Sequence, residues 1–379
     1  MNFCSNIIVF REKIAIFAGC GLIYNKRKMR FRRLADVLFI VLAAAVVISC
    51  KDDDKQESLP SLNGSIRFSI PTYISPESTH TIKVRGVTHP EGKDLGFYWR
   101  VFPSMAKNDS TNFKSEDGIF SFTHKFSDTL KTYTVYCGIF ASGYYSKTAS
   151  ASVTVVDGGL DRSITEAGLG TAGDVKFTDP RDGKTYFTRE IGQKIWFRQN
   201  LAYTGEITSG SGDKFGAGIP YDDAEAMGDV LGMFYTHNQA LNVCPEGWRL
   251  PSDDDFIELA KTAAPDVEAS KAEMIKGVAG HFMVNAKFNG TRMWEYWPTV
   301  TITNSTLMSA IPTGYAIVPE EDGQNTFDGI FSYAGFWTGD TDANGYGIYR
   351  YIYVDKPDLY ASSGAGSLAL PVRCIKDKQ

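Results

Sequence analysis

The chain has 379 residues, a formal net charge of −5, and 43% hydrophobic and 22% charged residues. This length predicts two or three domains, and the composition is that of a globular protein. The acidic balance argues against nucleic acid as a partner, which would require a basic surface. The aromatic fraction of 13% suits β-rich domains, whose cores take up most aromatic side chains, and it also suits sugar-binding surfaces.

The first 49 residues have the features of an export signal. Arg30, Arg32 and Arg33 form a positive region, and residues 37–48 are an apolar run. That run is too short to be a permanent membrane span. It leads into Val47-Ile48-Ser49-Cys50, which resembles the bacterial lipobox. The resemblance implies that Cys50 carries lipid, such as palmitate, and becomes the new N-terminus.

Met29 is the expected start of translation, and a genuine N-terminal extension over residues 1–28 is the alternative. The segment after the lipid site, Lys51-Asp-Asp-Asp54, resembles the acidic tag that sends Bacteroidetes lipoproteins to the outer face of the outer membrane. A solvated tether explains the same residues, because like charges keep a linker extended. We expect residues 50–60 to be a lipidated, acidic tether.

Residues 61–156 have the pattern of short strands separated by turns. Apolar and polar residues alternate between Gly64 and Ile70, as in a strand with one buried face. Strands at this spacing predict an antiparallel sandwich. Further strands are expected at residues 79–87, 96–102, 119–126, 133–140 and 149–156.

Two motifs in this first unit resemble the immunoglobulin-like domains called PKD domains. Phe97-Tyr98-Trp99 stands where that family has Tyr-x-Trp, and Phe126 to Val135 resembles its strand ending in Tyr-Thr-Val. The resemblance implies a spacer or binding module. Asp157-Gly158-Gly159 is the expected hinge to the second unit.

The second unit, residues 161–379, mixes strands with two helices. The turn signal Asp182-Gly183 lies within a strand-rich stretch. Ser252 and Asp255 form the pattern of a capping box, and the apolar residues that follow recur at helical spacing. The expected elements are a hairpin of residues 185–187 and 194–197, helices at 235–241 and 252–264, and strands at 316–318, 347–354 and 367–374.

The cysteines divide by their place in the chain. Cys4 and Cys20 precede the expected start, and Cys50 carries lipid, so an oxidising compartment acts on the remaining three. We expect Cys244 to pair with Cys374, closing a very long loop. Cys137 is then a buried free thiol. Because the chain has no Cys-x-x-Cys, a zinc or thioredoxin-type site is not expected.

The tryptophans of the second unit are expected to have two roles. Trp196, Trp248 and Trp337 have apolar neighbours and are assigned to the core. Trp294 and Trp297 lie in Trp-Glu-Tyr-Trp beside polar residues and are expected to be exposed. Since exposed aromatic clusters mark binding sites, Trp294, Tyr296 and Trp297 are the predicted ligand platform.

The second unit as a whole resembles the "major paralogous" domain named after Fibrobacter succinogenes, which many Bacteroidetes lipoproteins carry. The resemblance implies a C-type lectin-like α+β fold with a long-range disulfide. His237 departs from the expected aromatic residue, usually tryptophan. The motifs that carry the resemblance are Asp179 to Tyr186, Ile191 to Leu201, Gly232 to Ala240, Cys244 to Ser252, Met308 to Tyr315, Gly335 to Gly339 and Val372-Arg-Cys374.

No catalytic constellation stands out. Gly168 to Gly173 matches the dinucleotide-binding letters but lacks the strand and βαβ unit that such a site needs, so it is assigned to a linker. The five histidines form no His-Glu-x-x-His, and no Gly-x-Ser-x-Gly occurs. A related lectin-like shape hosts formylglycine-generating chemistry, which needs copper-binding cysteines, but here the cysteine pair is assigned to the disulfide. We therefore expect no enzyme and no cofactor.

Two short motifs could carry a ligand or a modification. Asp340-Thr-Asp-Ala-Asn344 places oxygen atoms at alternate positions, as some calcium loops do, but it lacks a distal glutamate, and a solvated turn explains it better. We expect no metal, and the calcium question stays open. Asp109-Ser-Thr111 and Asp128-Thr-Leu130 resemble the O-glycosylation motif of Bacteroidetes.

Taken together, the sequence predicts a mainly β or α+β protein with an immunoglobulin-like sandwich followed by a lectin-like domain. The predicted function is that of a surface-exposed outer-membrane lipoprotein with a non-catalytic binding or adhesion module. Its partners would be the outer membrane, held through the lipid anchor, and a glycan or surface protein. The alternative is a structural stalk or pilus-associated subunit with no small ligand.

Overall fold

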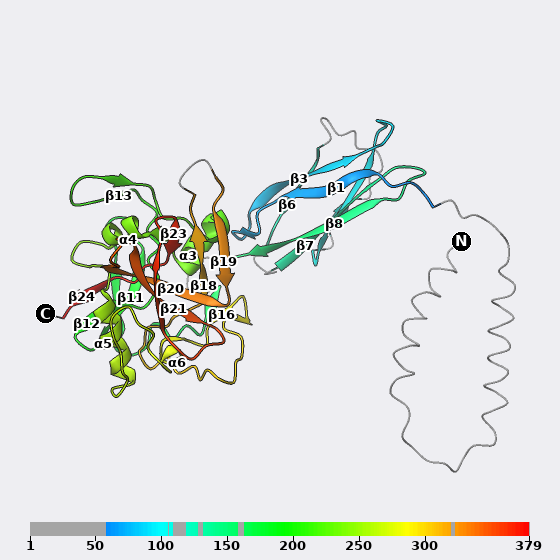
Figure 1. Cartoon of the computed structure of the whole chain (residues 1–379). Coiled ribbons are helices and arrows are strands. Elements are labelled where there is room, and N and C mark those ends of the chain that lie inside the picture. The colour runs from blue at the N-terminus through cyan, green and yellow to red at the C-terminus, as the bar shows by residue number, and fades with distance from the viewer. Residues whose placement is uncertain are drawn as a thin grey trace, which may run out of the picture. The chain divides into compact units, whose positions relative to one another are not determined.

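A computed structural model describes residues 58–104, 106–108, 119–127, 132–157, 163–319 and 323–378. The fold is mainly β, with several sheets and a few short helices (Figure 1). Residues 60–157 and the C-terminal region from residue 163 onward are described separately below.

The N-terminal region contains two sheets whose inner faces share one hydrophobic core. One sheet has the order β1-β3-β6 and the other the order β2-β8-β7-β4-β5. All pairs are antiparallel except β2 with β8. The strands are β1 (Asn63–Ser69), β2 (Tyr73–Ile74), β3 (Thr79–Thr88), β4 (Gly96–Phe102), β5 (Ala106–Asn108), β6 (Phe120–Lys125), β7 (Thr132–Phe140) and β8 (Lys147–Val155).

The predicted alternation explains this core. In β3, Ile82 and Val84 are fully buried while the residues between them are exposed, as a strand with one face toward a core requires. Phe97 of β4 stacks on Phe120 of β6, with ring centroids 4.9 Å apart. Cys137 is a buried free thiol on β7, as expected from the cysteine pattern. The expected strands are all present, within one to three residues of their predicted bounds.

The C-terminal region has a larger sheet and a smaller one. The larger sheet has the order β15-β23-β18-β20-β21-β22, with β19 also paired to β18, and the smaller one is β10-β11-β12-β24. In these two sheets the strands are β10 (Val175–Thr178), β11 (Thr185–Ile191), β12 (Lys194–Phe197), β15 (Tyr235–Thr236), β18 (Thr313–Ile317), β19 (Thr326–Ile330), β20 (Tyr333–Thr341), β21 (Gly347–Tyr353), β22 (Tyr360–Gly364), β23 (Leu368–Leu370) and β24 (Ile375–Asp377).

Short strands and helices fill the long connections of this region. They are β9 (Ile164–Thr165), β13 (Ile207–Thr208), β14 (Lys214–Phe215), β16 (Lys287–Phe288), β17 (Thr291–Arg292), η2 (Tyr221–Asp223), α3 (Glu225–Leu231), α4 (His237–Val243), α5 (Asp253–Ala263) and α6 (Ala279–Phe282). The expected hairpin is β11–β12, and the two expected helices are α4 and α5. Helix α4 begins two residues later than predicted because Tyr235 and Thr236 pair with β23.

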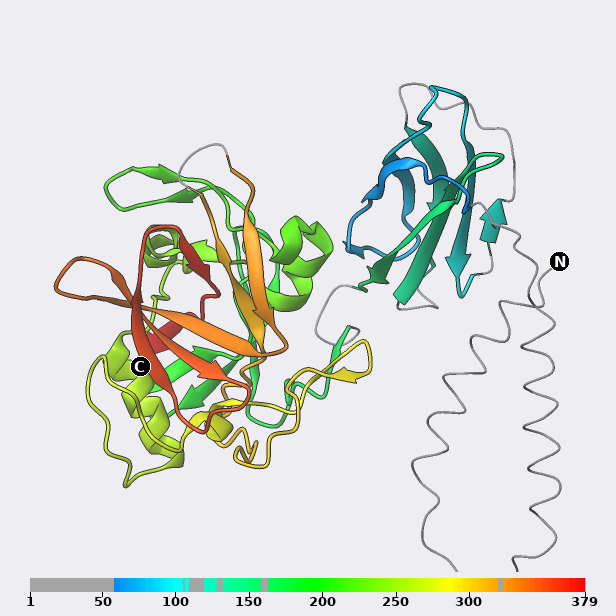
Figure 2. The same cartoon turned by 45° about the vertical axis from the view of Figure 1, so that its right-hand side comes forward.

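Helix α5 begins where its sequence predicts. The side chain of Ser252 accepts a hydrogen bond from the Asp255 backbone N–H, and the Asp255 carboxylate accepts one from the Ser252 N–H in return. This reciprocal pair satisfies two donors that the first turn leaves free. The apolar side of α5 packs against the larger sheet, where Phe256 meets Phe336 of β20 at 6.2 Å between ring centroids. Figure 2 shows the adjacent strands β20, β21 and β22 of that sheet in orange to red.

Candidate functional site

A run of tyrosines alternates with buried residues along β21. Tyr349, Tyr351 and Tyr353 are partly or largely exposed, whereas Arg350 and Ile352 between them are buried. Because successive side chains of a strand point to opposite faces, the three tyrosines share one face of the sheet. Arg350 and Ile352 lie on the other face, toward α5 and the core.

The neighbouring strands add tyrosines to the same face. In the antiparallel register, Tyr353 lies opposite Tyr333 of β20, and Tyr351 lies opposite both Gly335 of β20 and Tyr360 of β22. Directly opposed residues share a face and come within contact distance. Tyr315 of β18 reaches the cluster through the ring of Tyr333. We call this group the tyrosine face; its members are Tyr315, Tyr333, Tyr349, Tyr351, Tyr353 and Tyr360.

The rings of the tyrosine face form a continuous contact network. Tyr351 stacks on Tyr360 with centroids 5.2 Å apart and on Tyr333 at 5.6 Å. Tyr353 and Tyr315 each contact Tyr333 edge-on, with ring centroids 5.4 Å and 5.5 Å from its own. Offset-stacked and edge-to-face pairs of this kind each stabilise beyond their buried area, by about 0.5–1.5 kcal/mol. Each ring therefore restrains its neighbours before any ligand is bound.

Gly335 makes this arrangement possible. A Cβ atom at this position would lie 2.9 Å from the ring of Tyr333 and 2.9 Å from a methyl group of Leu370. A larger residue here would force the Tyr333 ring or the Leu370 side chain to shift. Gly335 therefore leaves room for the Tyr333 ring within the tyrosine face.

One end of the tyrosine face is covered and the other is open. Trp337, opposite Tyr349, is fully buried beneath α4, where the ring of His237 lies 4.9 Å from it. At the other end Tyr353 is 42% exposed. Tyr333, directly opposite Tyr353, is only 7% exposed. Solvent therefore reaches the rings mainly around Tyr353.

Carboxylates lie at the rim of the open end. The hydroxyl of Tyr360 donates to Asp358 at 3.4 Å. Burial raises the pKa of Tyr315, and the neighbouring Asp328 raises it further. Burial likewise raises the pKa of Tyr351 and of Tyr333 above the ordinary value. These phenols therefore stay neutral at physiological pH, and the charged side chains beside them, Asp328 and Asp358, are acidic.

The predicted ligand platform is wrong in its first residue. Trp294 is fully buried, and its indole Nε1 donates to the carbonyl of Ala310 at 3.0 Å. Tyr296 and Trp297 are 76% and 39% exposed. The polar neighbours of Trp294 suggested exposure, but the chain turns there so that Trp294 enters the core around α5 and α6. Two separate side chains remain where a three-ring platform was expected.

The other tryptophan assignments hold. Trp196 and Trp337 are buried, and the indole Nε1 of Trp337 donates to the carbonyl of Tyr235 at 2.7 Å. Trp248 is partly buried and packs against Phe197, with ring centroids 4.6 Å apart. The tyrosine face was not predicted, although the alternation of Tyr349, Tyr351 and Tyr353 was visible in the sequence.

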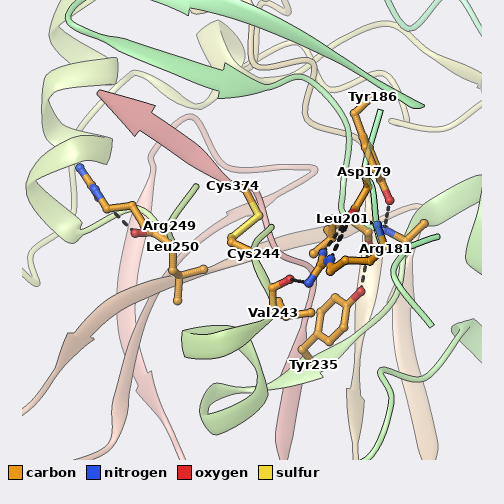
Figure 3. The surroundings of a disulfide bond; sticks show 11 residues. Asp179, Arg181, Tyr186, Leu201, Tyr235, Val243, Cys244, Arg249, Leu250 and Cys374 are labelled. Atoms are coloured by element: carbon orange, nitrogen blue, oxygen red, sulfur yellow. Dashed lines mark hydrogen bonds and ion pairs between the residues drawn. A yellow bond between two sulfur atoms is a disulfide. The ribbon is translucent and has the colours of Figure 1, made fainter. Parts of the chain in front are cut away.

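Cys244 and Cys374 form a disulfide, as the sequence analysis expected, and join residues 130 positions apart. Cys244 ends α4, and Cys374 directly precedes β24. Figure 3 shows Arg181 beside this bond. Its guanidinium donates to Asp179 at 2.6 Å and to the carbonyl of Val243 at 2.8 Å. A cation at a helix C-terminus is favourable, so this contact supports the helix end that carries the disulfide.

The turn at Asp340–Asn344 uses its own oxygen atoms. Oδ1 of Asp342 accepts from the backbone N–H groups of Asn344 and Tyr346, and Oδ2 of Asp340 accepts from the N–H of Asp253. Within the described ranges, no group of three or more His, Cys, Asp and Glu side chains is arranged to hold a metal ion. The backbone hydrogen bonds match the solvated turn that was one of the two interpretations of this motif.

Several predicted features lie outside the described residues. They are the export signal, the lipid site at Cys50, the hinge glycines Gly158 and Gly159, and both O-glycosylation motifs, Asp109–Thr111 and Asp128–Leu130. In the part of the chain that the structure does describe, no helix has the length and apolar character to cross a bilayer.

The region built around the disulfide and the tyrosine face also has a recognisable sequence. Residues 190–376 match the model of the Fibrobacter succinogenes major domain. This match supports the resemblance found in the second unit, and it spans every element from the end of β11 to β24. A comparison with curated proteins gave no match. The lectin-like and PKD resemblances stay predictions.

Proposed function

We propose that this protein is a surface-exposed, non-catalytic lipoprotein of the outer membrane and that its C-terminal domain binds glycans through the tyrosine face. The observation that carries the glycan part is the open end of that face, where Tyr353, Tyr351 and Tyr360 present linked rings on a rigid sheet. Exposed apolar or aromatic patches of this kind mark binding surfaces, and sites built on strands are held more precisely than sites on loops.

The chemistry of tyrosine suits a carbohydrate. A pyranose ring has an apolar face of C–H groups that can pack on an aromatic ring, while its hydroxyls need hydrogen-bond partners. Tyrosine supplies a large, rigid ring and a polar hydroxyl with little loss of conformational entropy. The network of ring contacts reduces that loss further, because neighbouring rings already restrict one another.

The rim favours neutral glycans. The carboxylates of Asp358 and Asp328 lie beside Tyr360 and Tyr315. Carboxylates accept strong hydrogen bonds from sugar hydroxyls, but they would repel a uronate or a sulfated sugar at this position. The proposed ligand of the tyrosine face is therefore a neutral hexose polymer or oligosaccharide.

The proposed location follows from the N-terminal sequence and the matched domain. The lipobox-like Val47–Cys50 and the acidic segment after it would place the folded domains outside the cell on a tether. Mass spectrometry of the exported protein tests this directly. An acylated Cys50 at the N-terminus is expected, and an unmodified N-terminus upstream of residue 50 would refute the anchor.

Binding is tested with the purified full chain on an array of neutral and acidic glycans, followed by titration calorimetry. Tyr353→Ala should weaken binding of a neutral hit at least about fivefold, as expected for a central aromatic contact. Tyr145→Ala is the matched control, because Tyr145 is 53% exposed but lies in the N-terminal region. Equal loss from both variants would contradict a specific role for the tyrosine face.

The same experiment separates two other hypotheses. Loss of binding in Tyr296→Ala, with Tyr353→Ala unaffected, would move the site to the remaining exposed part of the predicted platform. Silence across the whole array would favour the alternative, a structural stalk or pilus-associated subunit. Cross-linking on intact cells would then be expected to join this protein to another surface protein.

A further inference from the structure

A cavity of about 580 Å³ opens within the C-terminal region, away from the members of the tyrosine face. Volumes of this size are typical of small-molecule sites. Its lining combines apolar side chains with amides, hydroxyls, carboxylates and four cationic groups. The four cations are Lys176, Lys184, Arg198 and Arg373.

Arg198 in the cavity wall has a charge partner. Its Nη1 lies 2.7 Å from both carboxylate oxygens of Asp174, and the two side chains are almost fully buried. Nη2 donates to Ser309 Oγ at 2.8 Å and to the carbonyl of Gly168 at 3.0 Å. One buried cation thus faces one buried anion, and the donors of Arg198 are used within the protein.

Arg373 has hydrogen-bond partners but no countercharge among the described residues. It is 1% exposed. Its guanidinium donates to Asn200 Oδ1 at 2.7 Å and to the carbonyls of Met308, Ser309 and Phe197 at 2.9, 3.3 and 3.4 Å. All of these acceptors are neutral. Burial lowers the pKa of Arg373 to about 9, and the nearby charge of Arg198 acts in the same direction.

A buried cation without a countercharge is costly, because neutral acceptors replace only part of its hydration. The position of Arg373 is nevertheless fixed, since it directly precedes the disulfide cysteine Cys374. The protein therefore holds one positive charge in a cavity wall that an anion inside the cavity would neutralise.

The remaining charges of the lining do not supply that anion. Asp229 lies 2.9 Å from Lys184, so this pair is neutral. Lys176 lies over the ring of Phe187, 5.6 Å from its centroid, and Asp157 also lines the cavity. Asp174 behind Arg198 also lies 3.2 Å from Arg189, so five cations lie with the three carboxylates Asp157, Asp174 and Asp229. The excess charge is positive, and Arg373 is the buried cation in it without a carboxylate partner among the described residues, so an anion in the cavity would be favourable there.

We propose that this cavity binds a small sugar acid, with the single carboxylate facing Arg373 and the hydroxyls meeting Asn200, Gln199 and Ser309. The cavity is far larger than a bare carboxylate, and its amide and hydroxyl groups suit a polyhydroxylated ring. The apolar part of the lining, from Leu231 and Ile311 among others, suits the ring's C–H groups. The site is independent of the tyrosine face and of its neutral ligand.

Titration calorimetry with the purified full chain tests the proposal, with glucuronate as the probe. Glucose is the matched neutral control, and inorganic phosphate tests whether an anion without a sugar ring is sufficient. Glucuronate should bind at one site per chain, at least about tenfold more tightly than glucose or phosphate. No glucuronate binding, equal binding of glucose, or tighter binding of phosphate would each overturn the proposal.

Two variants locate the site. Arg373→Gln should abolish glucuronate binding, and a thermal melt shows whether this variant still folds. Lys176→Glu changes an exposed residue at the cavity and should weaken glucuronate about tenfold without lowering the melting temperature. Lys261→Glu makes the same charge change on the exposed side of α5 and should leave binding unchanged. If Lys176→Glu binds like the unaltered protein, the cavity is not the site.

The two proposals can fail separately. Tyr353→Ala should leave glucuronate binding intact, and Lys176→Glu should leave binding of a neutral glycan intact. If Tyr353→Ala removes glucuronate binding, the sugar acid binds at the tyrosine face and the cavity proposal is wrong.

Discussion

The N-terminal sandwich and the C-terminal domain are stabilised in different ways. The sandwich has a core of alternating apolar side chains, and its described ion pairs are exposed, as Lys125 with Glu77 shows. The C-terminal domain also has apolar cores, but it buries charged groups as well: Arg198 with Asp174, Arg350 with Asp253, and Arg373. Its long connections are fixed by backbone hydrogen bonds outside the sheets, by polar side chains and by one disulfide.

This difference has a physical cause. Backbone groups in a sheet satisfy one another along the ladder, so a sandwich needs only the correct alternation of apolar residues. A loop buried near the core must find other partners for its carbonyls and N–H groups. Arg350 illustrates the solution, because its guanidinium donates to Asp253 and also to the carbonyls of Glu273 and Ser270.

Removing the disulfide should have the largest effect. Cys244→Ala combined with Cys374→Ala opens a loop of 130 residues, which in the chain-entropy model costs about 4–5 kcal/mol of unfolding free energy. Hydrogen exchange measured by mass spectrometry should show loss of protection in α4, β23 and β24, while β7 and β8 keep theirs. Equal loss in the sandwich would contradict the separation of the two regions.

Breaking the Arg350–Asp253 ion pair should lower the free energy of unfolding nearly as much as removing the disulfide. Nε of Arg350 lies 2.5 Å from Asp253, and both side chains are fully buried. Arg350→Ala leaves the buried carboxylate of Asp253 without a countercharge, with the Ala272 N–H still donating to it, so about 3–5 kcal/mol of stability should be lost. Chemical denaturation measures this change. The matched control is Lys125→Ala in the sandwich, where an exposed pair is removed and no measurable change is expected.

One partly or fully buried histidine in each region makes stability depend on pH. Burial lowers the pKa of both His237 and His124. As the pH falls below about 6.5, these two histidines become protonated in the unfolded chain before they do in the folded protein. Both histidines should therefore contribute stability above that pH and lose it as the pH falls through their folded pKa. Denaturation between pH 5 and pH 8, in pH steps of about half a unit, should show stability rising with pH.

The two histidines should respond differently to substitution. His237 Nε2 hydrogen-bonds the carbonyl of Thr338 at 3.0 Å, so His237→Phe should lose about 1 kcal/mol at pH 8. His124 Nε2 is buried and has no hydrogen-bond partner among the described residues, so His124→Phe should be neutral or stabilising at pH 8. Each substitution should also reduce the dependence of stability on pH. A larger loss of stability from His124→Phe than from His237→Phe would contradict this prediction.

The smallest effect is expected at Cys137. Burial raises the pKa of its thiol to about 12, so almost no reactive thiolate exists at pH 7–8. Iodoacetamide should leave Cys137 unlabelled in the folded protein and should label it after denaturation. Rapid labelling of the native protein would show that the sandwich opens around β7.

The sequence predicted features that depend on neighbouring residues. The capping box at Ser252 and Asp255, the β11–β12 hairpin and the alternation in the sandwich strands all rest on contacts within a few positions, where side-chain chemistry and backbone period act directly. The Cys244–Cys374 disulfide could be predicted because the expected export and lipidation left only three cysteines available. The family resemblance also implied a long-range disulfide.

Only the tertiary structure decided which residues meet across long distances. Trp294 has polar neighbours along the chain, yet a turn of the loop carries it into the core. The tyrosine face collects side chains from β18, β20, β21 and β22, and Gly335 leaves room for the ring of Tyr333. The countercharge of an arginine follows from what lies beside it in space, so the difference between Arg198 and Arg373 could not be read from the chain alone.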